Sequence, residues 1–339
     1  MLNKNKTPLI IAEAGVNHNG KLINAFKLID AAKNAGADYI KFQIYKTENL
    51  VDKKIGLANY QKKNLKKKIS QFNMLKKYSL GFDKFFKIIK YCKKKKIKFI
   101  ATPFDLDSLQ FLKKNKVDFI KISSSDINNF EILSEVTKFN TDLILSSGLS
   151  DIKEIKETLD FLYKKKIKKK KLILLHCTSN YPTPIIDANL NVIKSLKKKL
   201  KISIGYSDHT RSLLSGAIAV SLGANIIEKH ITLKNTMAGP DHKASLNPKD
   251  FKLYVENINE GKKLLGSYKK KLNKSEILTK KIVSRYIVAK KFIKKGEIFS
   301  KNNITCKRTF YGISPNKWLK ILGKKSKKNF KIDERISLN

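Results

Sequence analysis

The chain has 339 residues, a formal net charge of +45 and 41% hydrophobic residues. It contains no run of about 18 apolar residues, and its first residues lack the apolar core of a secretory signal, so we expect a cytoplasmic protein without a membrane partner. The three cysteines are odd in number and widely spaced, which argues against a disulfide framework and against a thiolate zinc site.

The positive charge is an excess of lysine, because only four of the 73 basic residues are arginines. Proteins that recognise nucleic acids usually rely on arginine for bidentate and stacking contacts, so we predict no specific nucleic-acid partner. The lysines occur in runs such as 93–96 and 164–171, which are typical of solvated helix ends and loops. A non-catalytic barrel that binds polyanions through these lysines is kept as an alternative of another class.

In chain order, eight short apolar segments predict buried strands, and segments with helical spacing such as 25–35 and 213–223 lie between them. The predicted strands are 8–15, 37–44, 98–104, 119–123, 143–148, 172–177, 202–209 and 226–230. Nearly every one turns polar at its carboxyl end, which a doubly wound sheet would not ordinarily do on all eight. We therefore predict an α/β fold, a (β/α)8 TIM barrel with its site at these strand ends.

The segment after the second predicted strand is long and polar and contains Tyr60, Gln61 and Gln71. Its length indicates a functional loop between strand and helix. At the other end of the chain, a lysine-rich stretch precedes short strand-like pieces at 286–289 and 304–306. We expect a barrel domain over residues 1–267, a linker over 268–283 and a small β-rich domain over 284–339.

Several strings, in chain order, closely resemble the sialic acid (N-acetylneuraminate, or nonulosonic acid) synthase family. They are IAEAGVNHNG (11–20), KFQ (41–43), ATPFD (101–105), KISSSDINN (121–129), HCTSNYPTP (176–184), GYSDHT (205–210), EKHITL (228–233) and GPDHKASL (239–246). Residues 287–308 are similar to the family's carboxyl-terminal SAF, or antifreeze-like, module.

The resemblance implies a metal-dependent transferase. Such an enzyme condenses phosphoenolpyruvate with an open-chain N-acetylated hexosamine and water, giving a nine-carbon sialic acid and phosphate with C–O cleavage. N-acetylmannosamine is the first expected sugar, and a diacetamido sugar that gives legionaminate or pseudaminate is the alternative. Cationic and hydroxyl side chains suit the phosphate and carboxylate of phosphoenolpyruvate, and we expect these contacts from Lys41, Thr102, Lys121, Ser124, Ser146 and Ser207. The two lysines could alternatively pair with neighbouring carboxylates.

The resemblance also implies that His209 and His230 are catalytic residues that hold a divalent metal, with the other positions left to water and substrate. We expect manganese, with magnesium or cobalt as alternatives. From the residues alone, two hydrogen-bonded structural histidines are the alternative interpretation. Glu13 is expected to orient the sugar or accept a proton from water, or else to pair with a lysine. We predict no ligand role for His18, His176 or His242.

The family's sugar-binding positions match Asp126, Tyr181 and Asp241, although some members carry glutamate where this chain has Asp126. Tyr181 could also serve only turn packing. Arg308 resembles the family arginine that reaches the partner subunit's barrel, which implies a homodimer whose SAF domain completes the partner's site. The family commonly continues with proline and glycine, whereas this chain continues with Thr309 and Phe310.

Overall fold

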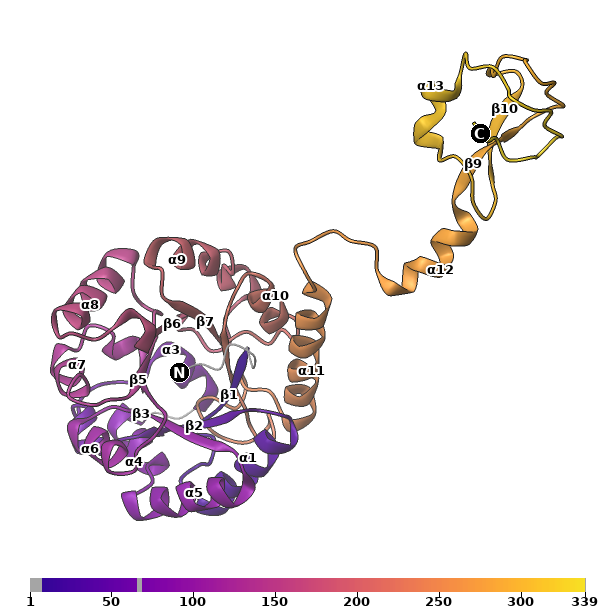
Figure 1. The fold of residues 1–339 in the computed structure, drawn as a ribbon. Coiled ribbons are helices and arrows are strands. Elements are labelled where there is room, and N and C mark those ends of the chain that lie inside the picture. The colour runs from indigo at the N-terminus through magenta and orange to yellow at the C-terminus, as the bar shows by residue number, and fades with distance from the viewer. Residues whose placement is uncertain (1–7, 66–68, 339) are drawn as a thin grey trace. The chain divides into compact units, whose positions relative to one another are not determined.

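The computed structural model describes residues 8–65 and 69–338 (Figure 1). The chain divides into two compact units, and the boundary lies between Gly266 and Ser267. Each unit is described below by itself.

The first unit is a closed barrel in which eight parallel strands follow one another in chain order, and β1 pairs with β8 to close it (Figure 1). The strands are β1 (Leu9–Gly15), β2 (Tyr39–Ile44), β3 (Lys98–Pro103), β4 (Phe119–Ile122), β5 (Asp142–Ser146), β6 (Leu172–Cys177), β7 (Ser203–Asp208) and β8 (Ile226–His230). This architecture confirms the predicted (β/α)8 fold.

Helices follow the strands and surround the barrel (Figure 1). They are α1 (Leu22–Asn34), α2 (Thr47–Leu50), α3 (Asn59–Leu65), α4 (Gln71–Tyr78), α5 (Phe82–Lys95), α6 (Leu106–Lys114), α7 (Phe130–Val136), α8 (Ile152–Lys164), α9 (Val192–Leu200), α10 (Ser215–Ser221) and α11 (Pro248–Leu265). Both α5 and α9 carry three lysines in their last turn, where they interact favourably with the carbonyl end of the helix. Part of the lysine excess therefore lies at solvated helix ends.

Apolar side chains fill the interior of the barrel at the end where the strands begin. A buried cluster inside the barrel comes mainly from the first residues of the strands, and its members are Leu9, Ile11, Tyr39, Ile100, Phe119, Ile144, Ile173, Leu175 and Ile226. A larger cluster packs the outer faces of the strands against the helices. Because the interior of a TIM barrel is filled by layers of side chains, this arrangement leaves the carboxyl ends of the strands to polar groups.

The long segment between β2 and α5 contains α2, α3 and α4 and has an apolar cluster of its own. Its buried members are Tyr45, Leu57, Met74 and Tyr78, and Val16 from the turn after β1 packs with them. The segment is therefore a folded layer at the carboxyl end of β2 and not an open loop.

The second unit contains an antiparallel pair, β9 (Arg285–Ala289) and β10 (Ile304–Arg308), and the short helix α13 (Trp318–Ile321). Its small core includes Ile287, Phe299 and Phe330. The expected linker 268–283 is exposed, and its second part forms α12 (Lys274–Val283), which has no buried residue. Among the described residues, no helix has both the length and the apolar character that crossing a bilayer requires.

Candidate active site

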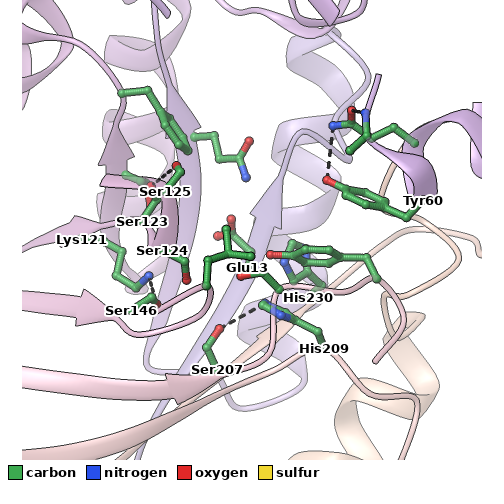
Figure 2. Close-up of a pocket in the computed structure, with 18 of the residues that line it drawn as sticks. Glu13, Tyr60, Lys121, Ser123, Ser124, Ser125, Ser146, Ser207, His209 and His230 are labelled. Atoms are coloured by element: carbon green, nitrogen blue, oxygen red, sulfur yellow. Dashed lines mark hydrogen bonds between the residues drawn. The ribbon is translucent and has the colours of Figure 1, made fainter. Parts of the chain in front are cut away.

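A cavity of about 670 Å³ opens at the carboxyl ends of the barrel strands (Figure 2). It brings together most of the side chains that the sequence analysis selected, namely Glu13, Lys41, Thr102, Lys121, Ser124, Ser146, Tyr181, Ser207, His209 and His230. Tyr60, Gln61 and Gln71 from the segment between β2 and α5 also line it. Figure 2 shows Glu13, His209 and His230 converging, with Lys121 and Ser146 on one side and Tyr60 on the other.

At the ends of both β7 and β8, two residues that are two positions apart line the cavity. Ser207 and His209 line the cavity from the end of β7, and Glu228 and His230 line it from β8. This follows from the alternation of side chains along a strand. Glu228 was not selected from the sequence, although its position two residues before His230 on a predicted strand would have identified it.

Two buried lysines and two buried carboxylates form a continuous charged network in the cavity. Lys41 Nζ lies 2.9 Å from Glu13 Oε2 and 3.7 Å from Glu228 Oε1. Lys121 Nζ lies 3.9 Å from the same oxygen of Glu228, which also accepts a hydrogen bond of 2.9 Å from Ser207 Oγ. The lysines thus pair with carboxylates, as the alternative interpretation expected, and also face the cavity.

Hydroxyl groups accompany both lysines. Lys41 Nζ donates a hydrogen bond of 3.2 Å to Thr102 Oγ1, and Lys121 Nζ donates to Ser146 Oγ. Ser124 Oγ accepts a hydrogen bond of 3.1 Å from the backbone N–H of Gly148. The cavity therefore offers ammonium and hydroxyl donors side by side, which is the combination that phosphate and carboxylate groups require.

The two carboxylates of the network differ in their ionisation. Burial raises the pKa of Glu13 to about 7, although the charge of Lys41 opposes this shift. Burial also acts to raise the pKa of Glu228, but the charges of Lys121 and Lys41 outweigh it and hold that pKa below its ordinary value. Glu228 is therefore a fixed negative charge, whereas Glu13 can take up or release a proton near neutral pH.

The two histidines are buried and neutral. His209 Nδ1 lies 2.7 Å from the carbonyl oxygen of Thr178, so Nδ1 carries the proton and Nε2 keeps its lone pair. Burial lowers the pKa of His209 to about 4 and lowers the pKa of His230 well below its usual range. The ring centroids are 5.5 Å apart.

This donor set fits a divalent cation. Neutral imidazoles are metal ligands, and a second ring nitrogen bonded to a backbone carbonyl is the usual way to orient one. His230 Nδ1 and Glu228 Oε2 are buried and have no hydrogen-bond partner within the described part of the chain. In that same part, no three histidine, cysteine or carboxylate side chains are grouped closely enough to hold a metal by themselves. A metal on His209 and His230 would thus need ligands from water or substrate.

Aromatic side chains form a wall above the histidines. The Tyr181 ring lies 4.2 Å from the His209 ring and 5.6 Å from the His230 ring, measured between centroids. Tyr60, on α3, lies 5.0 Å from Tyr181. Tyr181 therefore contacts the candidate ligands and is not confined to packing within its own turn.

Asp241 does not line the cavity but lies next to it. A Cβ built on Gly15 would be 3.3 Å from Glu13 Oε1 and 3.6 Å from both Asp241 Oδ2 and His230 Cε1. Gly15 has φ +50°, in the left-handed region that favours glycine. The three functional groups thus surround a space that the missing side chain leaves free, and burial raises the pKa of Asp241 to about 6.

Two further expected sugar contacts are not among the residues that line this cavity. The Asp126 carboxylate accepts hydrogen bonds from Ser123, Ser125 and Asn129 within its own turn, and Asp126 is not among the lining residues. Arg308 is an exposed residue at the end of β10 in the second unit. Their contacts with a sugar stay predictions.

The remaining histidines have local partners. His18 Nδ1 accepts a hydrogen bond of 3.0 Å from the backbone N–H of Gly20, and His176 Nε2 lies 2.8 Å from the carbonyl oxygen of Ala188. His242 bonds Thr232 and Asn19 through its two ring nitrogens. The cavity lining includes none of these three side chains.

The model of the NeuB family matches residues 28–270, and the model of the SAF domain matches residues 284–339. The chain belongs to the NeuB family. This confirms the resemblance found in the sequence.

Relatives of the NeuB-family chain cover nearly its whole length. The N,N'-diacetyllegionaminic acid synthase of Campylobacter jejuni subsp. jejuni is 45% identical and covers 98% of this chain and 99% of the relative. The protein of the same name from Legionella pneumophila subsp. pneumophila is 37% identical, and the match covers 95% of this chain and 91% of the relative. A solved structure of an N-acetylneuraminic acid (sialic acid) synthetase from Leptospira borgpetersenii serovar Hardjo-bovis, in complex with citrate, matches with a TM-score of 0.71 at 37% identity. The match covers 81% of this chain and 90% of that chain. These relatives are named as synthases or synthetases, and this chain is an enzyme of that class.

Proposed function

We propose that this enzyme is a nonulosonic acid synthase, which condenses phosphoenolpyruvate with the open-chain form of an N-acetylated amino sugar and releases phosphate. The observation that carries the proposal is the single cavity in which the buried lysines Lys41 and Lys121 lie with the histidine pair His209 and His230. Donors for an anionic substrate and ligands for an electrophilic metal are thereby available at one place.

Phosphoenolpyruvate would bind at the two lysines. Its phosphate and carboxylate need positive charge, which Lys41 and Lys121 supply, and hydroxyl donors, which lie beside them in the cavity. We assign the hydroxyl contacts to Thr102, Ser124, Ser146 and Ser207. Substrate binding would then replace part of the lysine–carboxylate pairing by lysine–substrate pairing.

His209 and His230 would hold the divalent metal, for which we propose manganese, with magnesium or cobalt as alternatives. When bound, the metal would act as a Lewis acid on the aldehyde of the sugar. The low pKa of both histidines keeps them in the neutral form that ligation requires.

Glu13 is suited to the proton transfer that the condensation requires. A new C–C bond joins C3 of phosphoenolpyruvate to the aldehyde carbon, whose oxygen becomes a hydroxyl. Water then adds its oxygen to the electron-poor C2 and gives up one proton, which balances the proton that the new hydroxyl takes up. The C2–O bond to phosphate then breaks, phosphate leaves with the second proton of that water, and the 2-keto acid remains. Glu13, with a pKa of about 7 and a position between Lys41 and His230, can accept the first proton of the water near neutral pH.

We propose a diacetamido-trideoxyhexose as the sugar, so that the product is a legionaminate. The two legionaminic acid synthases at 45% and 37% identity support this choice. The Leptospira structure supports N-acetylmannosamine, and therefore N-acetylneuraminate, as the second candidate. Tyr181 and Asp241 are the assigned sugar contacts nearest the histidines. Asp126 is the third, with a side chain shorter than the glutamate that some family members carry there.

We further propose a homodimer in which Arg308 of the SAF domain reaches the sugar in the partner's barrel. The family resemblance supports this role, and the exposure of Arg308 at the end of β10 is compatible with it.

The test is an assay of phosphate release with phosphoenolpyruvate, Mn²⁺ and a panel of sugars that includes N-acetylmannosamine and diacetamido-trideoxyhexoses. We expect turnover that a chelator abolishes, with the highest kcat/KM for a diacetamido sugar. Absence of turnover with every sugar, in metal-loaded and folded protein, would refute the synthase. Higher kcat/KM for N-acetylmannosamine would refute the proposed sugar alone.

The polyanion-binding alternative makes a different prediction. Because lysine contacts to phosphates release counterions, nonspecific binding should weaken steeply as salt increases. Nucleic-acid binding that survives moderate salt, in protein without turnover, would favour that alternative.

A further inference from the structure

A buried ion pair joins β7 and β8 on the side of the strands that faces the helices. Lys229 Nζ lies 2.9 Å from Asp208 Oδ2, and both side chains have 0% exposure. The two residues are register partners in the β7–β8 ladder. The pair is therefore a direct cross-link between the two strands.

Each member of the pair directly precedes a candidate metal ligand, since Asp208 comes before His209 and Lys229 before His230. Adjacent side chains along a strand point to opposite faces. The histidines accordingly face the cavity while Asp208 and Lys229 lie behind them. On the cavity side, a second cross-link joins the preceding register partners, because Ser207 Oγ donates to Glu228.

Further contacts fix both groups in place. Asp208 accepts hydrogen bonds from the hydroxyl groups of Tyr254 (2.8 Å) and Tyr206 (3.2 Å), and also from Ser215 Oγ and the backbone N–H of Thr210. Lys229 donates to the carbonyl oxygen of Thr210, and its Nζ lies 5.2 Å from the centroid of the Tyr254 ring. The network thus ties the ends of β7 and β8 to α10 and α11.

Stability alone is a weak reason for such a pair. Removing two charges from water costs several kcal/mol per ion, and well-packed apolar residues at the same place are often as stable or more stable. The outward positions of barrel strands normally carry apolar side chains that pack under the helices. A fully buried pair at this register, beside both histidines, is better explained by what it holds in place.

We propose that Asp208 and Lys229 are positioning residues, which set the relative placement of His209 and His230 so that the two imidazoles can share one divalent cation. This inference rests on the proposed metal site. It adds to that site a support that acts through the strands and touches neither the metal nor the substrate.

The first test replaces the pair by apolar residues of similar size, as the double variant Asp208→Leu, Lys229→Met. Such a replacement leaves no unpaired buried charge, although the hydroxyl groups of Tyr254, Tyr206 and Ser215 lose their acceptor, so the fold should be retained at reduced stability. We expect the Mn²⁺ affinity of the substrate-free protein, measured from free Mn²⁺ by electron paramagnetic resonance, to fall by about 10- to 100-fold, the usual loss when the support of a metal ligand is removed. Circular dichroism and urea unfolding report whether the variant is folded.

A matched control separates positioning from a general loss of stability. Thr158 is buried, donates a hydrogen bond of 2.8 Å to the carbonyl oxygen of Ile127 and has no contact with β7 or β8 in this network. Thr158→Val should lower the urea midpoint and leave the Mn²⁺ affinity at the wild-type value.

A milder variant decides the question if the first does not fold. Ser215→Ala, Tyr254→Phe removes two donors to Asp208 while keeping the ion pair, and we expect a several-fold loss of Mn²⁺ affinity. Wild-type Mn²⁺ affinity in a folded variant of either kind would overturn the inference and leave the proposed function standing. Wild-type protein that binds no Mn²⁺ would refute the metal site and, with it, the inference.

Discussion

Glu13 and Lys41 are partners in the register of β1 and β2, and their charged atoms lie 2.9 Å apart inside the cavity. The pairing holds an acid whose pKa is near 7 next to a cation proposed to bind the substrate. Although burial opposes it, the pKa of Lys41 is raised by Glu13 and Glu228. The same contact thus keeps the lysine charged and leaves the glutamate able to exchange a proton.

Lys41→Met should weaken binding of phosphoenolpyruvate. Hydrogen bonds to charged groups contribute about 1.5–3 kcal/mol, so we expect the KM for phosphoenolpyruvate to rise by roughly 10- to 100-fold. Steady-state kinetics at a saturating sugar concentration measure this KM. Lys46→Met is the control, because Lys46 forms an exposed ion pair with Asp107 and should leave KM unchanged. An unaltered KM in Lys41→Met would remove this lysine from the binding site.

His209→Ala should abolish metal-dependent turnover while the protein stays folded, because the ring lies at the cavity and its loss leaves the barrel ladder intact. We expect a loss of Mn²⁺ binding in isothermal titration calorimetry. His176→Gln is the control, since His176 bonds a backbone carbonyl away from the cavity lining and should keep the wild-type Mn²⁺ affinity. Metal-dependent activity that persists in His209→Ala would contradict the assigned ligand.

Arg308→Ala should raise the KM for the sugar and leave the KM for phosphoenolpyruvate nearly unchanged, because its proposed contact is with the sugar of the partner's site. The magnitude should again be roughly 10- to 100-fold, as for other charged hydrogen bonds. Arg285, its register partner on β9, provides a matched control in the same unit. Equal effects of Arg308→Ala and Arg285→Ala would argue against a specific role for Arg308.

Stability should fall in acid because of His18 and His242. Burial is the main reason why the pKa of each histidine is lowered from its ordinary value of 6.5 to about 4. Between these two values the unfolded chain binds more protons than the folded one, so the stabilisation is present above pH 6.5 and is lost as pH falls towards 4. The loss should be roughly 1–3 kcal/mol per histidine.

Urea unfolding at pH 7 and pH 4.5 measures this dependence. His242→Asn keeps a polar group near Thr232 without the titrating ring, so the difference in unfolding free energy between the two pH values should be smaller than in wild type. In Thr158→Val, by contrast, stability should drop by a similar amount at both pH values. An unchanged pH difference in His242→Asn would refute the contribution of His242.

The barrel and most of the cavity could be predicted because their signal is local. Nearly every predicted strand turns polar towards its carboxyl end, so Lys41, Lys121 and His230 could be expected at the same end of the barrel from their positions alone. Boundaries shifted by only a residue or two, as in β2, which begins at Tyr39.

What could not be predicted is the partner that a buried charged side chain takes. Lys229 lies in an apolar strand just as Lys41 and Lys121 do, yet it faces the helices and pairs with Asp208. Composition does not distinguish these cases, because a buried lysine needs a carboxylate on either face. Asp126 is a second case. Its match to a family position did not reveal that its carboxylate accepts hydrogen bonds from Ser123 and Asn129 in the same turn.

The segment between β2 and α5 has a practical consequence for redirecting the enzyme to other sugars. It supplies Tyr60, Gln61 and Gln71 to the cavity wall, and its apolar cluster around Leu57 and Met74 is separate from the barrel core. Libraries of variants restricted to this segment can therefore change the shape of the wall while the strands that carry the charged network keep their packing. We therefore expect that substitutions in this segment can change substrate selectivity with little loss of thermal stability.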